Sequence, residues 1–245
     1  MPTALRPIVT IALLLAASAG HCAAVPRQAQ SLGGTPMHFE TNRGQADPAV
    51  RFTAQGADYS VYLSPREAVL VLNQRDEAAQ DAAVALRLRL IGSRVSPDMA
   101  GLDDLPGEAD HLIGADPLKG RTGAPTYEKV RYSEVYPGID LIYFGSEQQL
   151  EYDFIVAPGA DPGRIALDFS GADRMDIDAE GDLLLETAAG TVRQHRPIAW
   201  QESGGRRREI GSRYVRRGAT RVGVQLDEYD RSLPLIIDPV LAAPR

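Results

Sequence analysis

The sequence predicts an all-β protein, an antiparallel β-sandwich built as one large or two closely packed sandwiches with little or no helix. Apolar and polar residues alternate at period two in many short runs, as in strands with one buried face. Glycine and proline separate these runs at the spacing of hairpin turns. This spacing predicts about 14 strands. No fixed-period repeat indicates a propeller or solenoid within the chain.

The first 24 residues have the features of a removed secretory signal. Arg6 precedes the apolar run Ile8–Ala17, and small residues follow at Ala17-Ser18-Ala19. The run is shorter than the roughly 20 residues that span a bilayer. We expect cleavage after Ala19, or alternatively after Ala24, and an exported protein without a transmembrane segment. The competing interpretation is a buried N-terminal strand or helix.

The cysteine content and the net charge argue against two further classes, disulfide-bonded proteins and nucleic-acid-binding proteins. Cys22 is the only cysteine, so no intramolecular disulfide can form. Lipidation of Cys22 is an alternative, but the residue before a lipidated cysteine is normally small, and His21 does not fit this pattern. Loss of residues 1–24 removes only Arg6, which leaves 25 Lys and Arg against 33 Asp and Glu, a net charge of −8. Such an acidic exported domain is a poor candidate for nucleic acid.

The first half of the chain predicts a linker and then short strands. Residues 25–36 are a polar linker, the β-sandwich module covers 37–241, and 242–245 form a tail. Asp76–Ala83 is either two turns of helix or an exposed connection. The Pro- and Gly-rich segments 92–107 and 114–125 predict surface loops. The expected strands are Val50–Ala54, Tyr59–Leu63, Ala68–Leu72, Val84–Leu90, Glu108–Ile113 and Tyr127–Tyr132.

Residues 130–172 are the centre of the pattern, because three alternating strands lie there between turns. Their apolar faces consist of Ile139, Leu141 and Tyr143, of Leu150, Tyr152, Phe154 and Val156, and of Ile165, Leu167 and Phe169. The segments Tyr136-Pro137-Gly138, Pro158-Gly159 and Asp161-Pro162-Gly163 supply fixed φ and positive φ where the chain reverses. A meander of hairpins follows, with strands at Arg174–Ile177, Leu183–Glu186, Thr191–Gln194, Pro197–Gln201, Arg208–Val215, Arg221–Leu226 and Leu235–Ile237.

Several ordered motifs resemble one known family. They are Phe39–Gln45, Val135–Leu141, Leu150–Phe154, Pro158–Pro162, Gly181–Leu183 and Leu235–Pro239. Over about residues 37–240 the chain resembles the uncharacterised domain that precedes SBBP-type β-propeller repeats in exported bacterial proteins. The resemblance implies an extracellular or cell-surface β-rich module with no assigned catalytic residues. Its motif residues of unknown role are Tyr136, Pro137, Gly138, Asp140, Glu151, Tyr152, Asp153, Gly159, Asp161, Pro162, Asp238 and Pro239.

The chain ends at Arg245, where the propeller repeats of that family would begin. We therefore expect either a module that works alone or a truncated version of a longer protein. A β-propeller in the same or another chain is accordingly a candidate partner.

Three carboxylates of the central strands are the first candidates for chemistry. Asp140, Glu151 and Asp153 lie on neighbouring strands, where a pair would serve a glycosidase as acid and as nucleophile or base. The alternation places Glu151 and Asp153 opposite the apolar face. We therefore interpret them as solvated strand residues without the burial that pKa tuning requires. Asp140 is expected to bind turn amides.

Metal sites are not predicted. The start of an EF-hand loop is imitated by Asp176, Asp178, Glu180 and Gly181, but position 12 is Thr187 instead of glutamate. We expect a tight acidic β-turn there. The histidines are isolated in the sequence, which argues against zinc: His38, His111 and His195.

One basic cluster interrupts the acidic sequence: Arg206, Arg207, Arg208, Arg213, Arg216, Arg217 and Arg221. It would suit an anionic polysaccharide, lipid head groups or an acidic partner. Nucleic acid would require interleaved aromatics, and only Tyr214 is present. The alternative is that these charges prevent edge-to-edge aggregation. Trp200 is expected in the core rather than in a sugar platform.

These observations predict an exported, non-enzymatic interaction or structural module without cofactor, catalytic or metal-binding residues. Its expected partner is a protein or polysaccharide at the cell surface. The alternatives are a secreted carbohydrate-active hydrolase and a carbohydrate-binding module that uses Trp200 and the arginines.

Overall fold

The computed structural model describes residues 37–56, 59–72, 84–111, 121–146 and 149–242. These residues belong to one compact unit, residues 31–245. The predictions for the signal, the linker, Cys22 and Asp76–Ala83 concern residues outside the described ranges.

The described residues form strands and one short 3-10 helix, which confirms the all-β prediction. The strands are β1 (Phe39–Thr41), β2 (Phe52–Gln55), β3 (Tyr59–Leu63), β4 (Glu67–Leu72), β5 (Val84–Leu90), β6 (Asp98–His111), β7 (Arg121–Tyr136), β8 (Ile139–Ser146), β9 (Gln149–Val156), β10 (Ala166–Ser170), β11 (Arg174–Ile177), β12 (Leu183–Thr187), β13 (Gly190–Gln194), β14 (Ile198–Ser203), β15 (Arg206–Ile210), β16 (Ser212–Arg216), β17 (Arg221–Leu226), β18 (Leu235–Asp238) and β19 (Val240–Ala242). The 3-10 helix η2 spans Pro162–Arg164.

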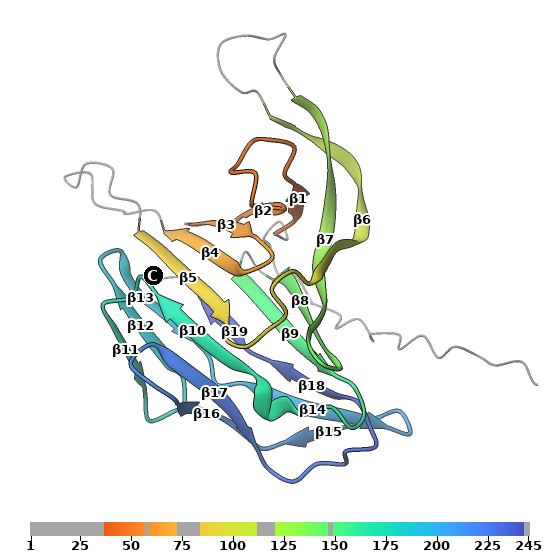
Figure 1. Cartoon of the computed structure of the whole chain (residues 1–245), viewed down its shortest axis with the longest axis vertical. Coiled ribbons are helices and arrows are strands. Elements are labelled where there is room, and N and C mark those ends of the chain that lie inside the picture. Colours follow the sequence, from red (N-terminus) through yellow and green to blue (C-terminus); the bar gives the residue numbers. More distant parts are fainter. Residues whose placement is uncertain (1–36, 57–58, 73–83, 112–120, 147–148, 243–245) are drawn as a thin grey trace, which may run out of the picture. The chain divides into compact units, whose positions relative to one another are not determined.

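The strands pair antiparallel in a single branched sheet (Figure 1). One path runs β16–β17–β10–β5–β4–β3–β2–β1–β7–β8–β9. From β9 one branch continues through β18, β14 and β15, and the other through β19, β13, β12 and β11. Strand β6 pairs with the opposite side of β7.

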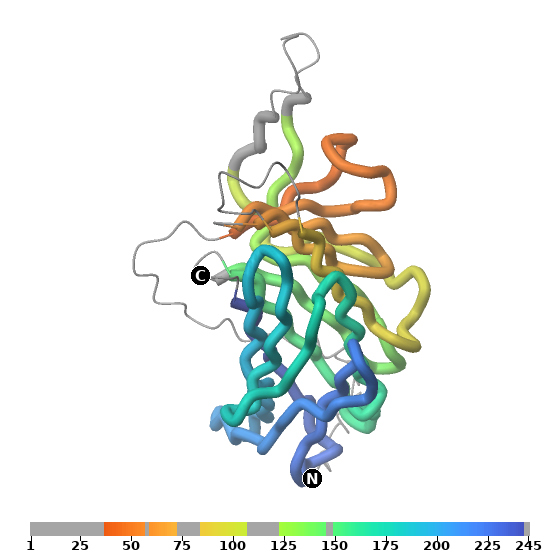
Figure 2. Tube along the Cα trace, turned by 90° about the vertical axis from the view of Figure 1, so that its left-hand side faces the viewer, coloured from red at the N-terminus to blue at the C-terminus, as the bar shows by residue number. Residues whose placement is uncertain are grey.

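This sheet is nearly closed and barrel-like, so the predicted sandwich is corrected. Strand β7 joins the two halves because it pairs with β1 at Tyr127 and with β8 from Lys129 onward. Figure 2 shows β1–β5, in orange to yellow, at one end and the blue C-terminal meander at the other. Hairpin patterns are alike in sandwiches and barrels, and the pairs β1–β7, β5–β10 and β9–β18, distant in sequence, decide between them.

The core is lined by the apolar faces that the alternation predicts. Every residue named for the three central strands is buried. Tyr143 is the middle of an aromatic row, with ring centroids 5.5 Å from Tyr132 and 5.6 Å from Tyr152. Tyr152 meets Phe154 edge-on at 5.9 Å. Such pairs add about 0.5–1.5 kcal/mol each beyond the area they bury.

The long loop predicted at residues 92–107 is wrong, because β6 begins at Asp98. Its amides and carbonyls pair with β7, and this ladder outweighs the local preference of glycine and proline for turns. The strand accommodates them through register shifts between Asp104 and Glu108, and Asp103 has a φ of 58°. Residues 121–125, predicted as loop, likewise belong to β7.

The single strand predicted at Arg208–Val215 is two strands, β15 and β16, which separate at Gly211. A Cβ on Gly211 would lie 2.1 Å from Oδ2 of Asp227. The absence of a side chain therefore allows the chain to pass from one edge of the sheet to the other beside Asp227.

Candidate functional site

The three carboxylates considered for glycoside hydrolysis lie on one face of β8 and β9. Asp140, Asp153 and Glu151 occupy alternate positions, opposite the face that carries Leu141 and Tyr143. Glu151 is only 7% exposed, so its predicted solvation is wrong. Strand β9 is central in the sheet, with paired neighbours on both sides. Asp153 is half-buried.

Asp140 stabilises a bulge in β7. Its Oδ1 accepts a hydrogen bond of 2.7 Å from the backbone N–H of Glu134, whose φ is 48°. The register of β7 and β8 shifts between Tyr132 and Tyr136. Asp140 thus binds a backbone amide, but this amide belongs to the bulge and not, as predicted, to the Pro137-Gly138 turn.

The closing motif of the sequence lies beside the central one. Strand β18 pairs antiparallel with β9 at Ile237 and Phe154, so Asp238, which follows Ile237, and Asp153, which precedes Phe154, lie beside each other in adjacent strands. Asp238 is 5% exposed, and Pro239 is also buried. The fold therefore groups Asp238 with Asp153 and Glu151, although about 85 residues separate them in sequence. Within the described ranges, no set of three or more His, Cys, Asp or Glu could hold a metal ion.

The two Pro-Gly turns of the motifs pack against each other. Gly138 and Gly159 have φ of 71° and 78°, which confirms their predicted positive φ. The N–H of Ala157 donates to the carbonyl of Gly138 at 2.9 Å. A Cβ on Gly138 would lie 2.9 Å from Cβ of Ala160, so only glycine fits.

Tyr136 and Asp161 complete these turns. The Tyr136 hydroxyl donates to the carbonyl of Ile91 at 3.1 Å, and burial raises its pKa. Asp161 caps η2 by accepting from the N–H of Gly163 at 3.0 Å. Gly163 lies in η2 and not, as predicted, at a positive φ. These motif residues thus hold the backbone in place.

The segment that imitates an EF-hand is the predicted acidic turn. Oδ1 of Asp178 accepts from the N–H groups of Glu180 at 3.1 Å and Asp182 at 2.9 Å. Nη1 of Arg193 donates to Asp178 at 2.7 Å and to Asp182 at 2.9 Å. The carboxylates therefore bind backbone amides and an arginine across the β12–β13 hairpin.

Asp182 and His195 form a contact that sequence spacing did not indicate. Oδ2 of Asp182 lies 3.0 Å from Nδ1 of His195, and Oδ1 accepts from the N–H of Arg196 at 2.8 Å. Burial opposes the charged form of Asp182, but hydrogen bonds from Arg196, Arg193 and His195 outweigh it and lower the pKa of this carboxyl. The contact favours the Nδ1–H tautomer of His195, whose side chain is 48% exposed. His195 is therefore isolated only in the sequence.

A buried chain of hydrogen bonds also went unpredicted. The Tyr152 hydroxyl donates to Oε1 of Gln194 at 2.9 Å, and Nε2 of Gln194 donates to the Tyr214 hydroxyl at 2.6 Å. The Tyr214 hydroxyl donates to the carbonyl of His195 at 3.0 Å. This chain joins β9, β13 and β16. It connects these strands through the interior of the nearly closed sheet.

The fold separates the predicted basic cluster into three groups. Arg206, Arg207 and Arg208 lie on β15. Arg216 of β16 reaches Oδ1 of Asp176 on β11 at 3.3 Å, and these two strands are ends of the branched sheet in the described residues. The remaining arginines lie on the outward side of β16 and β17: Arg213, Arg217 and Arg221.

Trp200 is half-buried and does not belong to the core, contrary to the prediction. The guanidinium carbon of Arg207 lies 4.3 Å from its ring centroid. A cation–π contact thus covers the ring face that a sugar would use.

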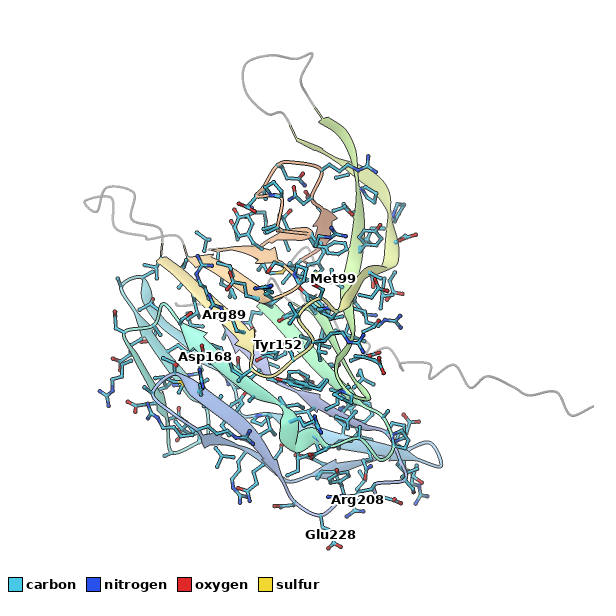
Figure 3. All side chains as sticks on the ribbon, in the orientation of Figure 1. Arg89, Met99, Tyr152, Asp168, Arg208 and Glu228 are labelled. Carbon is cyan, nitrogen blue, oxygen red and sulfur yellow. The ribbon has the colours of Figure 1, made fainter. Side chains whose placement is uncertain are left out.

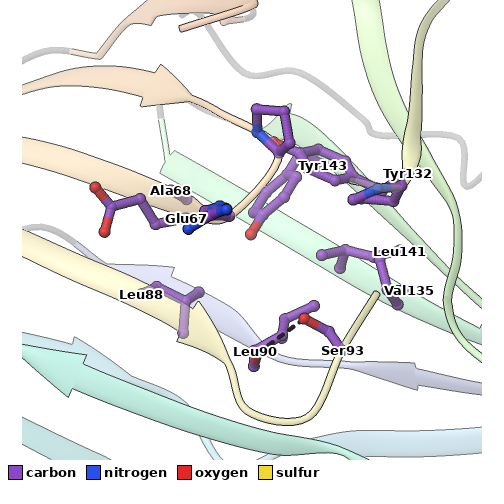
Figure 4. Close-up of a pocket in the computed structure, with 12 residues that line it drawn as sticks. Glu67, Ala68, Leu88, Leu90, Ser93, Tyr132, Val135, Leu141 and Tyr143 are labelled. Carbon is purple, nitrogen blue, oxygen red and sulfur yellow. Dashed lines mark hydrogen bonds between the residues drawn. The ribbon is translucent and has the colours of Figure 1, made fainter. Parts of the chain in front are cut away.

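One shallow pocket lies beside the end of β5 (Figure 4). Its volume of about 10 Å³ has room for roughly one water molecule and is far below the roughly 300–1,000 Å³ typical of ligand sites. Apolar and tyrosine side chains line most of it, and the Glu67 side chain extends away from the others. The hydroxyl of Ser93 donates to the carbonyl of Leu90 at 2.9 Å.

The described residues contain no helix that is long and apolar enough to cross a membrane. Residues 39–240 match the model of a protein family, DUF7948, whose description is a domain of unknown function. No curated protein and no solved structure matches the chain.

Proposed function

The chain belongs to the DUF7948 family, and from its structure we propose that it is an exported, non-enzymatic interaction module. The observation that carries this proposal is the outer edge of β6. Over Asp98–Pro106 this strand pairs with β7 on one side only, as far as the described residues extend. Strands β6 and β7 also project beyond the remaining sheet (Figure 1). An open strand edge binds an extended partner segment through main-chain hydrogen bonds.

The charge of this edge indicates what it binds. Asp98, Asp103 and Asp104 are exposed on β6. Lys129 of β7 pairs with Asp103 at 2.6 Å. A strand with basic outward side chains therefore complements the edge, whereas a second acidic edge is repelled.

The hydrogen bonds of several carboxylates support a structural role for these side chains. Asp140, Asp161 and Asp178 each accept hydrogen bonds from backbone N–H groups. Asp182 is held by Arg193, His195 and an amide. Carboxylates used in this way stabilise turns and bulges of the sheet.

The cellular setting is part of the proposal. The charged, apolar and small-residue pattern at the N-terminus supports export to the cell surface, the extracellular space or the periplasm. The motif resemblance supports an association with SBBP-type β-propellers, in the same chain or in another. The proposed partner of the β6 edge is accordingly a surface protein, such as a propeller that offers a strand.

The test combines native mass with an edge variant. Protein purified from the exported fraction of its host is expected in a species well above the 26.5 kDa of the chain. The substitution Leu102→Lys, on the half-buried edge of β6, is expected to release the partner while the melting temperature is retained. Val95→Lys is the matched control, because Val95 is 62% exposed and precedes the strand. A species at the mass of the chain alone would contradict the proposal.

The grouping of carboxylates favours one second candidate, a carbohydrate-active hydrolase. Asp153 and Asp140 share a face with the buried Glu151, and two carboxyl groups on neighbouring strands are the minimum that glycoside hydrolysis requires. Hydrolysis of a polysaccharide panel that Glu151→Gln and Asp153→Asn abolish would support this candidate. An inactive wild-type protein would remove it.

A further inference from the structure

A row of charged side chains crosses the outward face of five neighbouring strands. Glu67 of β4 lies opposite Arg89 of β5, Arg89 opposite Asp168 of β10, and Asp168 opposite Arg221 of β17. The N–H of Arg217, directly after β16, donates to the carbonyl of Arg221 at 2.8 Å. Figure 3 shows Arg89 and Asp168 on their neighbouring strands. The row combines residues from three distant parts of the sequence.

The carboxylates of this row are already neutralised. Oε1 and Oε2 of Glu67 accept from Arg87 at 2.6 Å and from Arg89 at 2.8 Å. Asp168 accepts from Nε of Arg221 at 3.1 Å and from the hydroxyl of Thr220 at 2.8 Å. Each acid thus has at least one arginine.

The cations at the opposite end of the row are more weakly neutralised. Arg217 donates to the carbonyl of Gly163 at 3.2 Å, and the described contacts give it no carboxylate. Its guanidinium lies over Gly223, where a Cβ would be 2.3 Å from Nε. Arg213 reaches Asp227 only at 3.7 Å, and both side chains are more than half exposed. Arg217 and Arg221 lie side by side, and only Arg221 has a carboxylate partner, so Arg217 is the guanidinium that a bound anion would neutralise.

We call this surface the arginine face and define it by Arg87, Arg89, Arg213, Arg217 and Arg221 with Glu67, Asp168 and Asp227. Five arginines meet three carboxylates there, a surplus of two positive charges in a chain of net charge −7. The outward positions between them are occupied by Ala166, Ser170, Val215, Gly223 and Gln225. None of these is aromatic or a large apolar anchor.

This composition selects among anionic partners. Single-stranded nucleic acid would require aromatic stacking, a membrane would require an apolar face, and protein partners usually bury aromatic anchors. The guanidinium groups lie on β5 and, beyond the Asp168 strand β10, on β17 and β16, so they extend across several strands that are each about 4.8 Å apart. An extended row of this kind suits a linear polymer with repeated carboxylates. We propose that the arginine face binds a carboxylated polysaccharide. This inference rests on the proposed interaction role, and it adds a second surface that does not include β6.

The test measures binding of the full chain to polygalacturonate by affinity electrophoresis and calorimetry. We expect retention by polygalacturonate and not by neutral dextran, with affinity that falls as salt rises, because the cations are exposed. The double variant Arg213→Glu with Arg217→Gln is expected to weaken binding at least about tenfold. Its melting curve shows whether the fold is retained. If Arg217→Gln disturbs the packing on Gly223, Arg213→Glu alone is expected to weaken binding in the same direction.

The matched control is Arg206→Glu with Arg208→Gln on β15, which makes the same change in net charge away from the arginine face. An equal loss of affinity in the control would overturn the proposal, as would absent binding or equal retention by dextran. Stronger binding to dextran sulfate, phosphatidylserine vesicles or poly-glutamate would also overturn it and identify a different anion. Leu102→Lys on β6 is expected to leave polygalacturonate binding unchanged, so a failure here is distinguishable from a failure of the β6 edge.

Discussion

Single polar residues with distant partners decide much of this structure. Gln194 is fully buried, and its amide uses both ends to connect Tyr152 with Tyr214. In the sequence it appears only as the last residue of a short strand. A buried amide is tolerated because each of its hydrogen bonds replaces one that it would make to water. Removal of one partner leaves the other polar group buried without a hydrogen bond, which costs free energy of folding.

Replacement of Gln194 tests this chain of hydrogen bonds. Gln194→Leu leaves the Tyr152 hydroxyl buried without its acceptor, so we expect the free energy of unfolding to fall by about 1–3 kcal/mol. Adding Tyr152→Phe removes the hydroxyl that has lost its acceptor. The fall in the free energy of unfolding of the double variant is therefore expected to be smaller than the sum for the two single variants. Urea denaturation measures all three variants. Gln225→Leu, at an exposed position, is the control, and strict additivity would contradict the expectation.

The acid stability of the protein tests Asp182. Its folded pKa lies below the usual value of 3.8, so its contribution to stability is present above that value and is lost as the pH falls through the folded pKa. We expect Asp182→Asn to lower the melting temperature at neutral pH and to flatten its decline below about pH 4. The exposed Asp173→Asn is the matched control. Parallel acid profiles of wild type and Asp182→Asn would count against this role.

At the scale of elements, a glycine of β6 allows this strand to lie close to β7, although the sequence of β6 is rich in residues that favour turns. Gly101 of β6 lies against the Tyr127 side chain, with its missing Cβ 2.4 Å from Cγ of the ring. Tyr127 in turn packs edge-on against Phe52, with ring centroids 5.9 Å apart. Glycine at this point therefore lets β6 lie close to β7 and its aromatic neighbours.

A methyl group at Gly101 tests that contact. Gly101→Ala forces the Tyr127 ring to move, and we expect a loss of about 1–3 kcal/mol from overpacking, with faster amide exchange in β6 and β7. Gly218→Ala is the control, because its Cβ would meet nothing nearer than 3.7 Å, at Arg221. Equal melting temperatures of the two variants would refute the close contact.

At the scale of the whole molecule, closure of the sheet concentrates tyrosines in one interior. Burial raises the pKa of Tyr132, Tyr143, Tyr152 and Tyr214 above the ordinary value of 10.0. The neutral hydroxyls thus stabilise the folded state below pH 10, and this contribution is lost as the pH rises towards the folded pKa values, because the unfolded chain ionises first.

Alkaline unfolding tests that interior. We expect tyrosinate absorbance and the loss of β-sheet circular dichroism to rise together above about pH 10. Tyr143→Phe is expected to flatten the alkaline decline in stability, and Tyr62→Phe on a half-buried position is the control. Ionisation of most tyrosines without loss of circular dichroism would contradict the closed interior.

The sequence by itself determined the all-β class, the inward faces of the central strands and the turns at Gly138 and Gly159. These follow from local rules, because a strand alternates at period two and a positive φ selects glycine. The structural role of Asp140 and the acidic turn at Asp178 were also predictable, since the carboxylates bind amides only a few residues away.

Only the tertiary structure decided the closure of the sheet, the strand β6 and the half-buried position of Trp200. It also decided the contacts of Gln194 and His195 and the alignment of Arg89 with Arg221 across Asp168. Each depends on which strands become neighbours, and that choice minimises the free energy of the whole sheet. Local alternation specifies the face on which a side chain lies, but not the strand that lies beside it.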